Sequence, residues 1–137
     1  MTVYSYSLPN VVEYIIAWQR GIIECDVHRP SGDVLPYCMV NGLGGNVDDN
    51  LFTGDPIVSI HTFGDTYEAA SDAADLTDGR MNLLIHDPGT NVMLQSGAIV
   101  NADYVQTVMT PAWISYGDQT IQEFVARYRV GLTFVAA

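Results

Sequence analysis

The sequence predicts an α+β fold with two amphipathic helices packed on one face of a largely antiparallel four-stranded sheet, in the order helix, strand, strand, helix, strand, strand. Apolar residues recur at helical spacing in two segments, whereas other segments alternate between apolar and polar residues as strands do. Strands that follow one another without an intervening helix are typical of antiparallel hairpins. A length of 137 residues suits one domain with a buried core, so we expect residues 1–137 to form it.

Two segments have the periodicity of helices with one apolar face. The first is predicted to begin after Asn10, a good N-cap. Its apolar face consists of Val11, Tyr14, Ile15, Trp18 and Ile22. The second is predicted over residues 65–86, with Pro88 and Gly89 ending it. Its apolar face consists of Tyr67, Ala70, Ala74, Met81, Leu84 and Ile85, and its acidic face of Asp65, Glu68, Asp72 and Asp75.

The strands are predicted from alternation and from turn signals. Residues 35–40 and 56–63 form a predicted pair, joined by a long connection at residues 41–55. Residues 41–50 of this connection are too rich in glycine and aspartate for helix or strand. Residues 92–101 are predicted as a third strand. The last segment alternates most clearly, because every even-numbered residue from Phe124 to Phe134 is apolar. Residues 102–116, which Pro111 interrupts, receive no assignment.

The charge balance excludes several classes of partner. Sixteen acidic residues stand against five arginines with no lysine, which gives a net charge of −11. Such a chain cannot bind nucleic acid by releasing counterions from phosphates, and an anionic membrane surface would repel it. No apolar run reaches the length of a membrane span, and no basic residue precedes Arg20 as in a secretory signal. The hydrophobic content of 48% is high, so we expect an assembly to bury part of the surface.

The two cysteines give no metal or disulfide motif. Cys25 and Cys38 are too few for a disulfide framework and too far apart for a zinc knuckle. We expect both to be reduced, buried thiols that act as small apolar side chains.

No set of residues makes a recognisable catalytic site. Ser59 and His61 share a strand face, and Asp65 follows them, which permits a serine nucleophile with its base. Side chains two apart on a strand point in parallel, however, which rarely places a histidine nitrogen on the serine oxygen. A GxSxG elbow is also absent. We therefore predict no enzyme, and solvent-facing polar residues on this strand.

Cofactor and metal motifs are equally weak. The glycine-rich run at residues 42–45 has no phosphate-loop pattern, and the three histidines have no metal-binding spacing. Four residues between the first two strands carry oxygen ligands suitable for calcium, but the EF-hand spacing is missing: Asp48, Asp49, Asn50 and Asp55. The acidic face of the second helix admits paired catalytic carboxylates, although a solvated surface is the usual role of such a face. We expect no cofactor and no metal.

Residues 35–81 carry a resemblance to a known family. The run LPYCMVN at 35–41 is followed by GGN at 44–46 and an acidic loop, and then by DPIVSIHTF at 55–63 and YEAASDAAD at 67–75. Together they resemble the tail terminator proteins of long, non-contractile-tailed (siphovirus-type) phages that infect actinobacteria. The resemblance implies a small α/β structural protein whose helices lie against one face of its sheet.

The resemblance also implies a place in the virion. Six copies would form a ring at the head-proximal end of the tail, stop addition of the major tail tube protein, and offer a surface to the head–tail connector or stopper protein. Assembly would take place in the host cytoplasm, and DNA would pass through the lumen without specific binding. A head-closure (stopper) or head–tail adaptor protein is the alternative. A calcium-dependent binding module and a small intracellular enzyme are the alternatives outside this class.

Two groups of residues are predicted to serve such a ring. The long connection is expected to contact other proteins through Leu43, Asp48, Asp49, Leu51, Phe52 and Asp55. Leu51 and Phe52 are the expected apolar anchors, unless both fold back onto their own domain. Acidic residues are expected to face the lumen, drawn from Asp48, Asp49 and the helix face Asp65, Glu68, Asp72 and Asp75.

Overall fold

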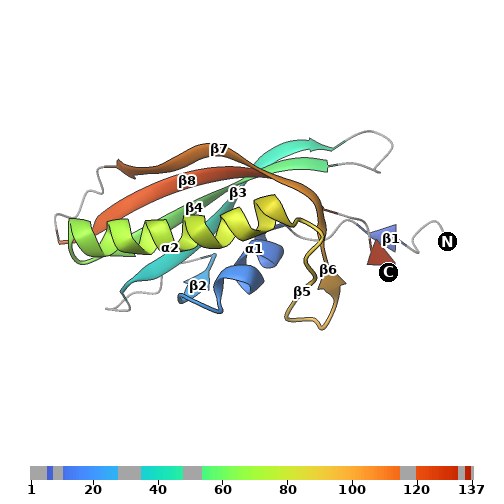
Figure 1. Ribbon diagram of the computed structural model, residues 1–137, viewed down its shortest axis with the longest axis horizontal. Coiled ribbons are helices and arrows are strands. Elements are labelled where there is room, and N and C mark those ends of the chain that lie inside the picture. Colours follow the sequence, from blue (N-terminus) through green and yellow to red (C-terminus); the bar gives the residue numbers. More distant parts are fainter. Residues whose placement is uncertain are drawn as a thin grey trace.

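The computed structural model describes residues 6–7, 11–27, 35–47, 54–114, 120–132 and 135–136. Two helices and a curved sheet dominate these residues (Figure 1). The elements are β1 (Tyr6–Ser7), α1 (Val11–Gln19), β2 (Cys25–Asp26), β3 (Tyr37–Val47), β4 (Gly54–Gly64), α2 (Tyr67–His86), β5 (Val92–Met93), β6 (Ile99–Val100), β7 (Ala102–Ile114), β8 (Gln122–Leu132) and β9 (Val135–Ala136).

The principal sheet has five strands in the order β2-β3-β4-β8-β7. The pairs β3–β4, β4–β8 and β7–β8 are antiparallel, whereas β2 runs parallel to β3. Two further pairs form separate two-stranded sheets, β1 with β9 and β5 with β6. The predicted α+β class with two helices is confirmed. The predicted four-stranded sheet is wrong in detail, because β2 adds a parallel edge strand that is too short to leave a periodic signal.

The third predicted strand is wrong, and one strand received no assignment, whereas the fourth predicted strand coincides with β8. Residues 92–101 do not form one strand, because they reverse at Gly97, whose positive φ of 91° favours glycine, and the Gly97 amide donates to the Leu94 carbonyl. The unassigned residues 102–116 contain β7 instead. Pro111 lies within this strand because β7 is at the edge of the sheet, where a missing N–H costs no ladder hydrogen bond.

The helix predictions agree closely with the structure. Thr66 caps α2, and its side chain accepts a hydrogen bond from the Ala69 amide at 3.0 Å. The helix ends at His86, as predicted. The first helix ends at Gln19, so Ile22 lies beyond it, in a turn where its amide donates to the Gln19 carbonyl at 3.0 Å.

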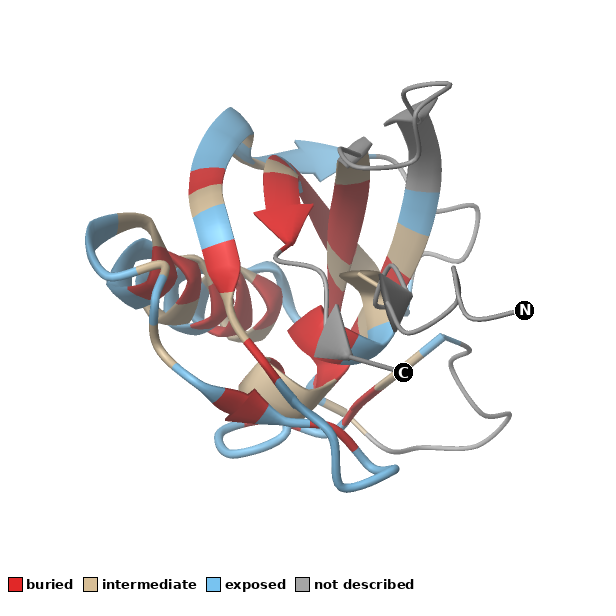
Figure 2. Cartoon of the chain, turned by 90° about the vertical axis from the view of Figure 1, so that its right-hand side faces the viewer, coloured by how far each residue is buried: buried red, intermediate tan, exposed pale blue. Residues whose placement is uncertain are grey.

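Both helices cover the same face of the sheet. The strand residues that face them are apolar and alternate along each strand, and they form one buried cluster with residues of both helices. Six of these strand residues lie on β4 and β8: Val58, Ile60, Ala126, Tyr128, Val130 and Leu132. The side of α2 toward the sheet is buried, and its outer side is exposed (Figure 2). None of the helices in the described ranges is long and apolar enough to cross a membrane.

The two helices are fastened to each other by reciprocal hydrogen bonds. The Trp18 indole N–H donates to the Arg80 carbonyl at 2.8 Å, and Arg80 Nε donates to the Trp18 carbonyl at 3.1 Å. The Arg80 guanidinium lies 3.7 Å from the centre of the Trp18 ring, a cation–π contact. Beside this pair, Gln19 donates to the Thr77 carbonyl at 3.1 Å. The short helix α1 is thereby held on α2 as well as on the sheet.

A matched pair of glycines tests how closely α2 lies on β4. A Cβ at Gly64 would overlap the Ala70 backbone, whereas a Cβ at Gly79, within α2, meets no atom within 4 Å. Gly64→Ala should therefore lower the free energy of unfolding by about 1–3 kcal/mol through overpacking. Gly79→Ala should raise it by about 0.5–1 kcal/mol through helix propensity. Urea unfolding monitored by circular dichroism measures both, and equal effects of the two substitutions would contradict the close approach.

Candidate functional site

The connection between the first two main strands is shorter than predicted. β3 continues to Val47 and β4 begins at Gly54, so residues 41–47 are strand and not loop. The glycine-rich run is accommodated because the register of β3 against β4 shifts between Gly42 and Gly45, as at a β-bulge. The prediction that this composition forbids a strand is therefore wrong.

The predicted contact residues of that connection fall into two groups. Asp48, Asp49, Leu51 and Phe52 lie outside the described residues, together with Asn50, so their roles and the calcium hypothesis stay predictions. Leu43 and Asp55 lie in β3 and β4, and Asp55 pairs in register with Asn46. Asp55 therefore lies on the paired part of the two strands, whereas Leu43 lies in the irregular stretch between Gly42 and Gly45.

The structure brings the predicted acidic residues together on one surface. Asp65, Glu68, Asp72 and Asp75 are all exposed, and they follow α2 at intervals of three and four residues from its N-terminal end. Among the residues that the structure describes, no group of three or more histidine, cysteine and acidic side chains is arranged to hold a metal ion. The acidic stripe is a solvated face of the helix.

Exposed apolar side chains gather along the β7 edge of the sheet. Val108, Trp113 and Ile114 are 45%, 48% and 37% exposed. At the same end Tyr67 is exposed and packs edge-on against Phe124, with the ring centres 5.2 Å apart. The register shifts of β7 against β8 near Thr107, Met109 and Ala112 bend this edge. In the described part of the chain, β7 has a neighbouring strand on one side only, which makes it an edge strand of the principal sheet.

A three-residue polar chain lies on the opposite face of the sheet from the helices. Ser59 Oγ is 2.7 Å from His61 Nε2, and His61 Nδ1 is 2.5 Å from Glu123 Oε2. A neutral imidazole with its proton on Nδ1 satisfies both contacts, since Nδ1–H donates to Glu123 while Nε2 accepts from the serine hydroxyl. The prediction that parallel side chains would keep Ser59 away from His61 is wrong, and the acidic partner is Glu123 on β8 and not Asp65 on the way to α2.

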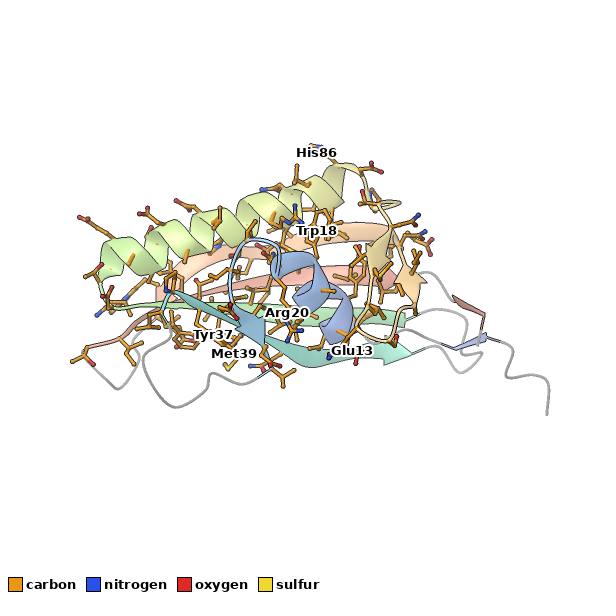
Figure 3. The ribbon with its side chains drawn as sticks, turned by 90° about the horizontal axis from the view of Figure 1, so that it is seen from below. Glu13, Trp18, Arg20, Tyr37, Met39 and His86 are labelled. Atoms are coloured by element: carbon orange, nitrogen blue, oxygen red, sulfur yellow. The ribbon has the colours of Figure 1, made fainter. Side chains whose placement is uncertain are left out.

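The hydrogen bonds of the polar chain Ser59–His61–Glu123 resemble those of a serine nucleophile with its base and acid. Its serine, however, is buried, whereas a nucleophile must be accessible to substrate. Ser59 is 1% exposed and Glu123 is 6% exposed, so the hydroxyl is not presented to solvent. Ser59 lies between Asn41 of β3 and Arg127 of β8 in register. Met39, the β3 neighbour of His61, carries its side chain on the same outer face (Figure 3). The polar chain thus connects β4 and β8, because His61 lies on β4 and Glu123 on β8.

A separate hollow of about 250 Å³ lies between α1 and β2. Arg20, labelled with Glu13 in Figure 3, lines it and approaches Asp26 at 3.5 Å, with both side chains about half exposed. The volume is below the range of sites that enclose small ligands, and the ion pair is solvated. Nothing in the geometry of this hollow assigns it a ligand.

Comparison with known proteins identifies the fold. No model of a known protein family matches the chain, and no curated protein matches it in sequence. Among solved structures, the fold is similar to a chain in the "Virion of native gene transfer agent (GTA) particle", with a TM-score of 0.53 and 12% sequence identity. The similarity covers 86% of this chain and 83% of that chain. The two chains therefore share a fold over most of their lengths.

Removing Glu123 tests whether the polar chain supports the fold. Glu123→Ala should leave the partly buried imidazole N–H of His61 without its acceptor and lower the free energy of unfolding by about 1–2 kcal/mol. Glu68→Ala, which removes an exposed carboxylate from α2, should change it by less than about 0.5 kcal/mol. Urea unfolding at neutral pH measures both variants.

Chemical labelling of Ser59 separates a structural from a catalytic role for the polar chain Ser59–His61–Glu123. Because Ser59 is buried, a fluorophosphonate probe should not label the native protein, and Ser59→Ala should give the same result. Stoichiometric labelling that depends on Ser59, His61 and Glu123 together would show an accessible nucleophile and overturn this interpretation.

Proposed function

We propose that this chain is a structural protein of a phage or phage-like virion, in which it closes the completed tail tube as a tail terminator ring. The observation that carries the proposal is the shared fold with a chain of a gene transfer agent virion, over 86% of this chain. The terminator role, the ring of six copies and the place at the head-proximal end of the tail come from the sequence resemblance at residues 35–81. A stopper or adaptor protein is the alternative within the same class.

The open edges of the sheet support a ring-forming contact. β7 bounds one side of the sheet, and on the other side β2 pairs with only Cys38 and Met39 of β3. The described residues place no strand along the rest of that outer edge of β3. Two different edges at opposite ends of one sheet permit head-to-tail contacts between copies, which close into a ring when the rotation between neighbours fits. The exposed Val108, Trp113 and Ile114 supply apolar area at one of them.

The acidic surface supports a lumen through which DNA passes without adhering. The chain has a net charge of −11, and Asp65, Glu68, Asp72 and Asp75 form an exposed stripe on α2. In the proposed ring this stripe lines the passage. Repulsion between these carboxylates and the phosphates would prevent tight binding of the duplex while it moves.

Deleting the gene for this protein from the genome of its phage or phage-like particle tests the proposal. The same experiment distinguishes a terminator from a stopper or adaptor. Loss of a terminator should give tail tubes of abnormal, extended length that do not join heads, visible by negative-stain electron microscopy. Loss of a stopper or adaptor should leave tails of normal length beside heads that fail to join them. Tails of normal length attached to filled heads would contradict both roles.

Complementation then tests the edge contact. Val108→Glu places a charge on the β7 edge and should fold normally in a thermal melt but fail to restore tail length. Leu83→Glu is the matched control, because Leu83 is a similarly exposed apolar residue that lies on α2 and not on an edge strand. Complementation by Val108→Glu as complete as that by Leu83→Glu would exclude β7 as the contact.

A binding titration tests the role of the charge. We expect no measurable affinity for duplex DNA in a gel-shift titration at physiological salt. A variant with Asp65, Glu68, Asp72 and Asp75 all changed to their amides should retain its fold, because these side chains are exposed, and should reduce the repulsion. A salt-sensitive micromolar Kd of the unmodified protein would contradict the proposed passage.

A further inference from the structure

The two cysteines of the chain lie directly opposite each other on neighbouring strands. Cys25 of β2 and Cys38 of β3 are partners in the parallel register, and their sulfur atoms are 3.1 Å apart. Both are buried free thiols, in agreement with the prediction from the sequence. Their proximity was not expected, because thirteen positions separate them in the sequence.

The surrounding backbone holds this pair in place. The Cys38 amide donates to the Glu24 carbonyl at 2.8 Å, and Arg20 Nε donates to the Cys25 carbonyl at 3.1 Å. Directly paired residues on neighbouring strands have Cα atoms at a separation that a disulfide spans, and side chains on the same face of the sheet. Only the two sulfur atoms need to approach for a bond to form.

We propose that Cys25 and Cys38 are a redox-active pair that forms an intramolecular disulfide when the protein meets an oxidising environment. A low-molecular-weight disulfide such as oxidised glutathione is the oxidant. The thiolate of one cysteine attacks it, which gives a mixed disulfide and releases one glutathione thiolate. The thiolate of the other cysteine then attacks the protein sulfur of the mixed disulfide. Two glutathione thiols are released in total, and the two cysteines are oxidised by two electrons.

Access for the oxidant comes from the small size of β2. The hydrogen bond between the two thiols and burial raise the pKa of Cys38 well above its usual range, so the thiolate is scarce while the strands are paired. β2 has two residues and lies at the edge of the sheet, so separating it from β3 breaks few contacts. Oxidation is therefore slow in the folded protein and fast during folding.

The disulfide would fasten a weak part of the fold. It links the edge strand β2 covalently to β3. The segment that follows α1 is thereby attached to the principal sheet. It also closes the loop of residues 25–38, which reduces the conformational freedom of the unfolded chain. The inference depends on the two thiols alone and not on the proposed function in a virion.

The test uses the whole protein in two redox buffers. The protein is unfolded in urea with reductant and refolded in either oxidised or reduced glutathione, so that burial does not prevent reaction. It is then denatured, alkylated with iodoacetamide and weighed by mass spectrometry. The sequence contains two cysteines, so an unalkylated monomer that has lost two hydrogens identifies this bond. We expect that species in the oxidised buffer, with a Tm roughly 5–10 °C above that of the reduced protein.

Cys25→Ala is the control, since it removes one partner and retains the buried Cys38. Its Tm should not rise in the oxidised buffer, and mass spectrometry should show alkylation, glutathione or a second chain on Cys38. If the unmodified protein refolded in oxidised glutathione is instead fully alkylated, glutathionylated or cross-linked between chains, the proposal is wrong. A disulfide that forms but leaves the Tm unchanged would overturn the stabilising role.

Discussion

The pairing of β4 with β8 is the constraint on which the rest of the structure depends. It joins the β3–β4 hairpin to the β7–β8 hairpin, with pairs running from Ile57 and Arg129 to Gly64 and Gln122. The two strands are distant in sequence, but loop-closure entropy grows only with the logarithm of loop length. α2 begins at Tyr67, three residues after β4 ends at Gly64, and it packs on both β4 and β8. The Tyr128 hydroxyl of β8 then donates to Asp78 of α2 at 2.5 Å, and burial with this contact raises the pKa of Tyr128.

The polar chain on the other face makes the register of β4 against β8 specific. A slip of β8 by one residue would move Glu123 to the helix side and leave His61 without its acceptor, in addition to exposing the apolar face of the strand. Burial makes that loss costly, because an unpaired polar group in a low-dielectric site forfeits its hydration. A constellation that resembles a hydrolase triad can therefore be retained for specificity of pairing. Its contacts alone do not establish catalysis.

Local patterns predicted the elements whose neighbours in sequence determine them. The alternation in β8 and the capped, amphipathic α2 were predicted correctly, since each buries one face against a core. Three features were missed because their cause is distant in sequence. Pro111 is tolerated only because β7 is an edge strand, the glycines of β3 are strand only because β4 pairs with them across a bulge, and Glu123 meets His61 only through the pairing of β4 with β8. The acidic stripe follows from a local helical pattern. Its residues were predicted to lie on one exposed face of the helix, and they are exposed. The contact residues at 48–53 lie outside the described residues.

The shape of the β7 edge restricts how copies could associate. A long, flat edge strand would accept any other strand and promote open-ended aggregation. β7 is bent by register shifts near Met109, and Pro111 lacks an N–H, so a straight partner strand cannot pair along its whole length. A partner must match the bend and cover the apolar side chains that flank it, such as Val108 and Trp113. Head-to-tail contacts that fix one angle between neighbours satisfy this requirement, and in the proposed ring that angle would have to divide a full turn into equal parts.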